Sequence, residues 1–214
     1  MENQIPVSTD QLQLVEIQKK LTLDTKIKNS AGWFFWIAGL SILNTILYLT
    51  GAEITFVLGL GATQVVDGFM SAVANEMGGV SLIVVIIQFI IDLLFAGVFI
   101  FLGIMGRKRK TWAIIVGIVL YSIDALLAIA FLDLLGFGFH IFAIIMIAGS
   151  FKAIKDLTAL ELAGNTESID SLRQKMPPAA IPAVTPKQKK TRLILAGAII
   201  FIVVTSIIFA GFGQ

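Results

Sequence analysis

Two aspartates lie inside long apolar runs of this sequence. Asp92 falls within the run at about 79–105, and Asp124 within the run at about 111–132. On insertion scales, an ionised side chain at the centre of a bilayer costs roughly 2.5–3.5 kcal/mol, so such residues face protein or water and often mark function. The pair allows two interpretations: a proton or cation site, and protonated side chains that hydrogen-bond neighbouring helices.

Further polar residues occur at helical spacing beside these aspartates or within the other apolar runs. At about 1.5 Å of rise per residue, they fall at mid-membrane or in its outer half. The sequence therefore predicts either one polar cavity that opens outward or a set of separate interhelical hydrogen bonds. For the single histidine, His140, a hydrogen bond to Asp133 is the alternative to a role in ligand binding. The candidate cavity residues are Asn44, Gln88, Asp92, Tyr121, Asp124 and His140.

Catalytic chemistry has little support in the sequence. Two aspartates on adjacent helices resemble the paired carboxylates of intramembrane aspartyl proteases, which share a proton to activate water. However, the Gly-Leu-Gly at 59–61 is followed by Ala62 rather than by aspartate, and the two carboxylates fall at different depths. Cysteine is absent, as are phosphate-binding glycine loops, serine triads and His-Glu zinc motifs. We therefore expect no catalytic residue, metal or cofactor, and keep an aspartyl hydrolase as a remote alternative.

The composition of the runs that must position these residues indicates a membrane. The chain is 57% hydrophobic and 14% charged, whereas soluble domains average about 25% charged. Runs of about 20 apolar residues match the length a helix needs to cross ~30 Å of hydrocarbon. All 16 Lys and Arg residues fall in three stretches, at 19–28, 107–110 and 152–192. This partition follows the positive-inside rule and argues against a nucleic-acid partner.

These patterns predict an all-α integral membrane protein whose main part is a four-helix transmembrane bundle at 31–163. A tight turn at Gly136 and Gly138 should precede the fourth span, whose helix continues past the membrane. A Pro-rich cytosolic linker at 164–192, kept extended by its prolines, should tether a fifth transmembrane helix at 193–212. The expected bundle spans are about 32–49, 79–105, 111–132 and 139–151.

The positive stretches also predict the orientation. With residues 1–30 in the cytosol, five spans place the basic turn and the linker in the cytosol and the C-terminus outside. The N-terminal segment should contain either an amphipathic helix, which lies on the membrane or on the cytosolic ends of the bundle, or an extension of the first span. The basic turn should set the topology and contact anionic lipid at the cytosolic face. Its residues are Arg107, Lys108, Arg109 and Lys110.

Residues 54–77 are long enough to span, yet a span here would place the basic turn outside. We therefore expect a re-entrant or interfacial segment on the outer face. The break at Gly59 and Gly61 predicts a helix over about 62–75, with Thr63 as its cap. Two polar residues mark this outer-face segment as a second candidate site. They are Gln64 and Asp67.

Three short stretches are similar to a family of small uncharacterised bacterial membrane proteins. They read GWFFWIAGLS at 32–41, GLGATQVVD at 59–67 and LGFGFHIFA at 135–143. The resemblance covers about residues 25–155 and implies a location in the prokaryotic plasma membrane. It implies no activity, although it draws further attention to Gln64, Asp67 and His140.

Two main hypotheses of function follow. The first is a structural, adaptor or assembly protein of the membrane, which binds lipid and a membrane-protein partner or a second copy of itself. The second is a small oligomeric transporter or channel that uses the polar cavity, although the chain has no internal repeat of the kind that many transporters show. The tolerance of Asp92 and Asp124 to substitution would discriminate between them.

Overall fold

The computed structural model describes residues 9–49, 60–76, 82–163 and 168–175, and every regular element within these ranges is an α-helix. The expected fifth span at 193–212 and the prolines of the linker lie outside the described residues. The helices are α1 (Thr9–Ala31), α2 (Trp33–Leu49), α3 (Gly61–Glu76), α4 (Leu82–Arg107), α5 (Thr111–Ala130), α6 (Leu134–Ala163) and α7 (Ile169–Lys175).

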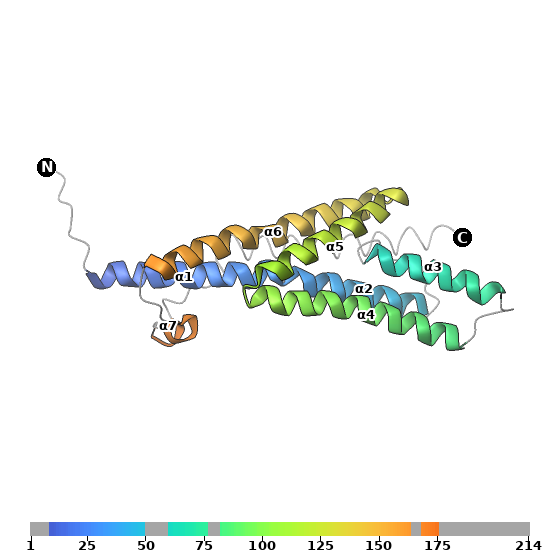
Figure 1. Cartoon of the computed structure of the whole chain (residues 1–214), viewed down its shortest axis with the longest axis horizontal. Coiled ribbons are helices and arrows are strands. Elements are labelled where there is room, and N and C mark those ends of the chain that lie inside the picture. The colour runs from blue at the N-terminus through green and yellow to red at the C-terminus, as the bar shows by residue number, and fades with distance from the viewer. Residues whose placement is uncertain (1–8, 50–59, 77–81, 164–167, 176–214) are drawn as a thin grey trace, which may run out of the picture.

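The long helices form an elongated bundle of two pairs (Figure 1). α2 packs on α4, and α5 packs antiparallel on α6. The pairs lie close together near the turn between α4 and α5, and they diverge toward the other end of the bundle. α3 occupies this wider end, where it packs on α4 and α5. α1 continues the line of α2 away from the bundle and packs along the second half of α6.

Three of the described helices are long and apolar enough to cross a membrane: α4, α5 and α6. Most residues in the apolar part of each of these helices are not buried inside the bundle. Large aliphatic side chains such as Leu94, Leu126 and Ile145 are exposed there. Water would disfavour such a surface, whereas lipid chains would not. α2 is equally apolar in sequence but has only 17 residues, about 25 Å at the helical rise.

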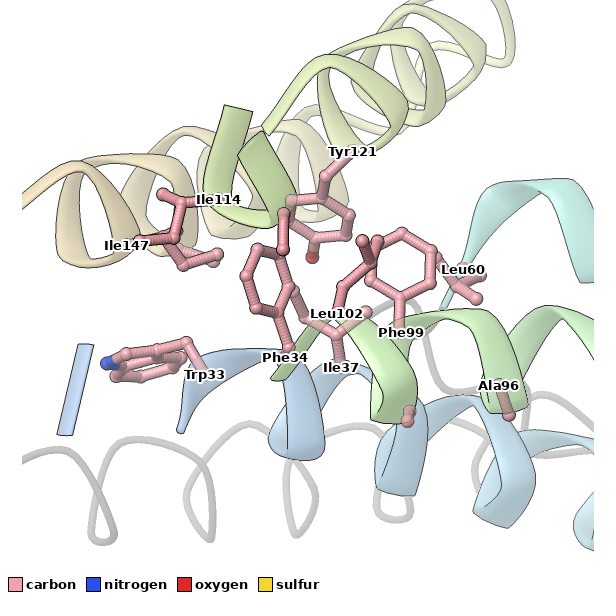
Figure 2. Close-up of a cluster of buried hydrophobic side chains, with 13 residues drawn as sticks. Trp33, Phe34, Ile37, Leu60, Ala96, Phe99, Leu102, Ile114, Tyr121 and Ile147 are labelled. Atoms are coloured by element: carbon pink, nitrogen blue, oxygen red, sulfur yellow. The ribbon is translucent and has the colours of Figure 1, made fainter. Parts of the chain in front are cut away.

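Small residues bring the helices of the core close together (Figure 2). Phe34 of α2 is fully buried and lies with its ring 6.1 Å from that of Phe99 in α4. Gly117 of α5 leaves the space that the Phe34 ring occupies, since a Cβ there would lie 2.2 Å from Phe34 Cζ. Close approach over small residues is the usual way that membrane helices pack, because apolar burial gives no advantage over lipid.

The turns at both ends of α5 use the same backbone device. Arg109 and Leu132 have positive φ angles of 62° and 58°, and in each turn two N–H groups donate back to carbonyls of the preceding helix. This pattern is the Schellman motif, in which a residue in the left-handed region ends the helix. Asp133 then begins α6, because its Oδ1 accepts the N–H of Gly136 at 2.8 Å. The turn expected at Gly136 and Gly138 is therefore wrong: both glycines lie within α6, which begins about five residues before the expected span.

The cytosolic part of the prediction needs a second correction. Residues 169–175 of the expected extended linker form the helix α7, because the prolines begin only at Pro177 and the Ser168 hydroxyl accepts the N–H of Ser171 at 3.2 Å. Ile169 and Leu172 of α7 are buried in a cluster with α1 and α6. α1 leads into α2 with an interruption only at Gly32, and it packs against α6 at this end of the bundle. This arrangement agrees both with a helix on the end of the bundle and with an extension of the first span.

We predict that Gly117→Ala destabilises the bundle by roughly 1–3 kcal/mol, because the added methyl group overlaps the Phe34 ring. Gly97→Ala is the matched control, since a Cβ at this helical glycine of α4 meets nothing within 4 Å. Alanine at that site should leave stability unchanged or raise it slightly. Unfolding midpoints of both variants in detergent micelles measure the difference, and equal midpoints would contradict this packing.

Candidate functional site

The carboxylate of Asp124 lies at the start of α3 and binds its backbone. Its Oδ2 accepts the N–H of Gly61 at 2.9 Å, and its Oδ1 accepts the N–H of Ala62 at 2.7 Å. The first N–H groups of any helix lack partners within the helix, and the helix dipole favours negative charge there. A side chain of α5 therefore caps α3. The cap expected from Thr63 is wrong, because its hydroxyl instead donates to the carbonyl of Leu60 at 2.7 Å.

His140 of α6 completes this cluster from the other side. Its Nε2 lies 2.7 Å from Oδ2 of Asp124, and both side chains are almost fully buried. The antiparallel α5–α6 pair explains the match in height: Asp124 precedes the end of α5 by six residues, and His140 follows the start of α6 by six. Both therefore lie about 9 Å below the turn. The ring of Tyr121 stacks on the imidazole with its centroid 4.3 Å away.

The hydrogen bonds of His140 define how many protons the cluster holds. Nδ1 lies 2.6 Å from the carbonyl oxygen of Gly136, which can only accept, so Nδ1 carries a hydrogen and donates. The short contact between Nε2 and Oδ2 then requires one more proton between them. This proton belongs either to an imidazolium beside a carboxylate or to a carboxylic acid beside a neutral imidazole. In both forms the pair has no net charge.

A second polar contact joins α2 to α4. The hydroxyl of Thr45 donates to Oδ2 of Asp92 at 3.0 Å and lies 3.2 Å from the carbonyl of Ser41. A small hollow beside this contact is otherwise lined by Ile42, Phe89 and Leu93, and its volume is about 10 Å³. Such a space is about the minimum for one water molecule. The Asp92 site therefore has the dimensions of an interhelical contact rather than of a ligand pocket.

The structure thus distributes the predicted cavity residues between two groups of contacts. Tyr121, Asp124 and His140 lie together, and the alternative bond from His140 to Asp133 is wrong because His140 binds Asp124. Asp92 bonds α2 instead. The other two candidates, Asn44 and Gln88, are buried on α2 and α4. Gln64 and Asp67 belong to α3, but their side chains lie outside the described part of the structure.

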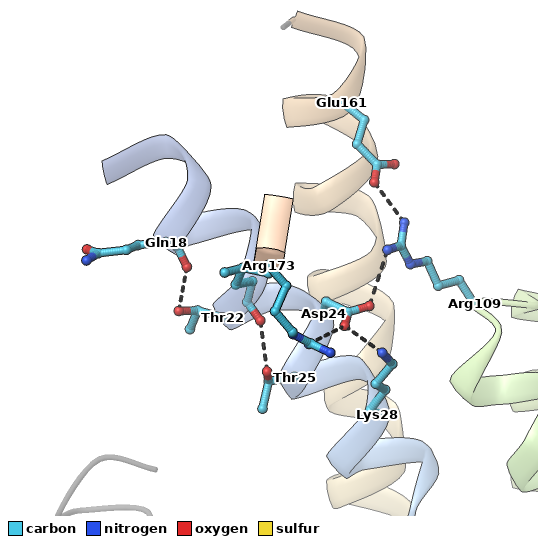
Figure 3. Close-up of polar contacts among 9 residues, drawn as sticks. Gln18, Thr22, Asp24, Thr25, Lys28, Arg109, Glu161 and Arg173 are labelled. Atoms are coloured by element: carbon cyan, nitrogen blue, oxygen red, sulfur yellow. Dashed lines mark hydrogen bonds and ion pairs between the residues drawn. The ribbon is translucent and has the colours of Figure 1, made fainter. Parts of the chain in front are cut away.

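A cluster of charges holds the opposite end of the bundle together (Figure 3). Asp24 of α1 is buried, and its carboxylate lies 2.9 Å from Lys28, 3.2 Å from Arg109 and 3.6 Å from Arg173. Arg109 also donates to Glu161 of α6 at 2.8 Å. These contacts connect α1, the α4–α5 turn, α6 and α7. A buried carboxylate is stable only with such partners.

The basic turn thus includes one residue with a structural role that the sequence analysis missed. Arg109 binds Asp24 and Glu161, whereas Arg107 lies over the ring of Phe35 at 5.4 Å and Lys108 and Lys110 are exposed. The only local signal was the spacing of Asp24 and Lys28, which suits an ion pair on one helix face. Nothing in the sequence indicates that Glu161 and Arg173 reach the same turn.

Comparison of the chain with protein-family models, with curated proteins and with solved structures found no match. The similarity to small bacterial membrane proteins at 32–41, 59–67 and 135–143 therefore stays a prediction. The function must be argued from the site itself.

We predict that Asp124→Ala releases the start of α3. The N–H groups of Gly61 and Ala62 would lose their acceptor inside the bundle, at roughly 1–3 kcal/mol for each buried donor left without one. Hydrogen exchange of the protein in detergent should then accelerate in α3 and remain slow in α5 and α6. If the amides of α3 kept their protection, Asp124 would not be the cap.

For the charge cluster, we predict that Asp24→Asn lowers the free energy of unfolding by about 1–3 kcal/mol, because three cations lose their shared anion. Asp156→Asn on α6 is the control, since Asp156 makes no ion pair with the described residues. Denaturant unfolding at low and high salt measures both variants. The interpretation would be wrong if they were equally stable, or if added salt left their difference unchanged.

Proposed function

We propose that this protein is a multi-pass membrane scaffold or adaptor that holds a helical platform at the cytosolic surface for a protein partner. In this proposal α2, α4, α5 and α6 cross the membrane, α3 forms an outer re-entrant segment, and residues 193–212 form a fifth span. The N-terminus lies in the cytosol and the C-terminus outside, and the membrane is the plasma membrane of a bacterium.

The positions of the charges support this orientation. The segments that carry Lys28, Arg109 and Arg173 meet at one end of the bundle around Asp24. Between Lys28 and Arg107, and again between Lys110 and Lys152, the chain has no Lys or Arg. α3 and the α5–α6 turn lie at the other end. Positive residues concentrated at one end favour the cytosolic side for that end.

The scaffold proposal depends mainly on the bonding partners of Asp92 and Asp124, the two carboxylates within the apolar helices. Asp124 accepts two backbone N–H groups and pairs with His140, and Asp92 bonds Thr45 beside a hollow of about 10 Å³. A transport or catalytic carboxylate needs room for its ion or substrate. These carboxylates instead bind other helices of the same chain, as polar residues commonly do in membrane bundles.

The platform consists of α1, the second half of α6 and α7, joined by a buried apolar cluster and by the contacts of Asp24. α1 extends beyond the end of α6 (Figure 1), and there it carries exposed apolar side chains. Leu12 is 59% and Val15 62% exposed, and both lie outside the apolar membrane-length segments. Exposed aliphatic groups on a helix in water are typical of a surface that binds another protein.

A small transporter or channel is the second candidate. α3 supports it, because α3 begins about 20 Å along α5 and its N-terminus points at a buried ionisable pair. Transporters often bind their substrates at such interrupted helices near mid-membrane. Flux of protons or ions in liposomes that carry the purified protein would favour this candidate over a scaffold.

We predict that Leu12→Glu combined with Val15→Glu separates the protein from its partner without unfolding it, because both side chains are already exposed. Gln11→Glu combined with Gln13→Glu is the matched control, since it adds the same charge to the same helix and removes no apolar surface. The size of the particle extracted from native membranes in mild detergent measures the effect. A large complex that survives the first pair, or a wild-type protein that runs alone, would contradict the scaffold proposal.

A further inference from the structure

We propose that Asp124 and His140 form a single proton-binding site that controls whether α3 remains docked in the bundle. This inference goes beyond the scaffold role and does not depend on it. It rests on one buried cluster in which a helix N-terminus, a carboxylate and an imidazole share their hydrogen bonds. The ligand is a proton, and the element that responds to it is α3.

When one proton is shared between Nε2 and Oδ2, every polar atom of the pair has a hydrogen-bond partner. Nδ1 donates to Gly136, one proton lies between Nε2 and Oδ2, and the carboxylate oxygens accept from Gly61 and Ala62. Its net charge is zero, which suits a site where both side chains are at most 4% exposed. The docked position of α3 therefore corresponds to this form.

Loss of the proton breaks one of these bonds. A neutral imidazole beside a carboxylate can keep its hydrogen on Nδ1, and then the lone pair of Nε2 faces Oδ2. It can instead move the hydrogen to Nε2, and then Nδ1 faces the carbonyl of Gly136 at 2.6 Å. Either arrangement places two acceptors together and leaves a buried negative charge.

Gain of a second proton breaks the cap. With the imidazole charged and the carboxyl protonated, the new O–H must point at a backbone N–H of α3 or lack an acceptor. The site then carries a net positive charge at the N-terminus of a helix, where the dipole is also positive. Gain of a proton therefore weakens the hold on Gly61 and Ala62, whereas loss of the proton disturbs the contact with His140 but leaves a carboxylate that still accepts both N–H groups.

Among the residues that the structure describes, few other ionisable groups lie near the pair. On α5 the neighbour is Tyr121, which stacks on the imidazole, and α6 contributes only His140 at this height. The acidic residue within the apolar part of α4, Asp92, bonds Thr45 of α2. On α3 the acidic positions are Asp67 and Glu76, which follow the first turn. No Lys or Arg occurs in α2, α3 or the apolar part of α4, α5 or α6 that faces this site.

α3 has a second attachment, so release at its start need not unfold it. Met70 and Ala74 near its far end pack with Val84 of α4 in a separate apolar cluster. Loss of the cap would let the first turns of α3 swing away from α5 while this contact holds. The movement would expose the buried side chains of Leu60 and Thr63.

The natural absence of cysteine allows a direct distance measurement. Spin labels at Val65→Cys in the first turns of α3 and Ile115→Cys on α5 report the docking of α3, since both side chains are exposed. Labels at Leu94→Cys on α4 and Ile115→Cys form the control pair. The distances are recorded in lipid bilayers from about pH 4 to about pH 10, a range that covers the titration of carboxyl and imidazole groups in proteins generally.

We expect one α3–α5 distance at neutral and alkaline pH and a second, longer distance toward the acidic end of the series. The ratio of released to docked α3 should change by up to about tenfold per pH unit, the limit for one linked proton. Asp124→Asn should leave the start of α3 partly released at every pH, because its amide offers one acceptor oxygen in place of two for Gly61 and Ala62. Asp92→Asn, equally buried, should respond as the wild type does.

Three outcomes would overturn the proposal. The first is an α3–α5 distance that stays constant over the whole pH series. The second is a change in the α4–α5 control pair at the same pH, which would indicate a global response. The third is an Asp124→Asn variant with the same acid response as the wild type, which would place the proton site elsewhere.

Discussion

The hydrogen bonds between Asp124 and the first turn of α3 are the constraint on which the wider end of the bundle depends. A helix that starts inside a membrane protein presents several backbone N–H groups with no partner, and each would be costly in a dry environment. Here one carboxylate accepts from two of them, and a proton shared with His140 keeps the site neutral. α5 and α6 are antiparallel, with Leu132 forming the turn between them and Asp133 capping the start of α6. This arrangement places Asp124 and His140 at the same height.

The same principle operates at the other end of the molecule, where a buried aspartate again binds groups from several elements. Asp24 is buried among cations from three separate elements, and Arg109 adopts a left-handed backbone conformation that usually favours glycine. The side chain of Arg109 explains its presence there, because it reaches both Asp24 and Glu161. Asp124 and Asp24 thus each connect several helices, one toward either end of the bundle. An apolar core of aromatic rings and small residues lies between them (Figure 2).

Much of this architecture could be predicted from the sequence, and the failures have physical causes. The apolar runs predict the helices α2, α4, α5 and α6, because length and hydropathy are local properties. It was also predictable that Asp124 and His140 face protein rather than lipid, because ionisable residues are rare within apolar spans. Their partners were not: the cap of α3 comes from a residue about sixty positions away, and a pattern-based cap such as Thr63 considers only neighbours. The turn expected at Gly136 was misplaced because a non-glycine residue, Leu132, carries the positive φ angle of the α5–α6 turn.

The central claim is that Asp124, His140 and the start of α3 form one closed hydrogen-bonded unit. Nitrogen-15 NMR of the histidine side chain in lipid bilayers tests it most directly, because the chain has a single histidine and gives a single-site spectrum. The account predicts a protonated Nδ1 and an Nε2 in a strong hydrogen bond, with the Nε2 signal altered by Asp124→Asn and unaffected by Asp92→Asn. An imidazole that exchanges freely with water and does not respond to Asp124→Asn would contradict it.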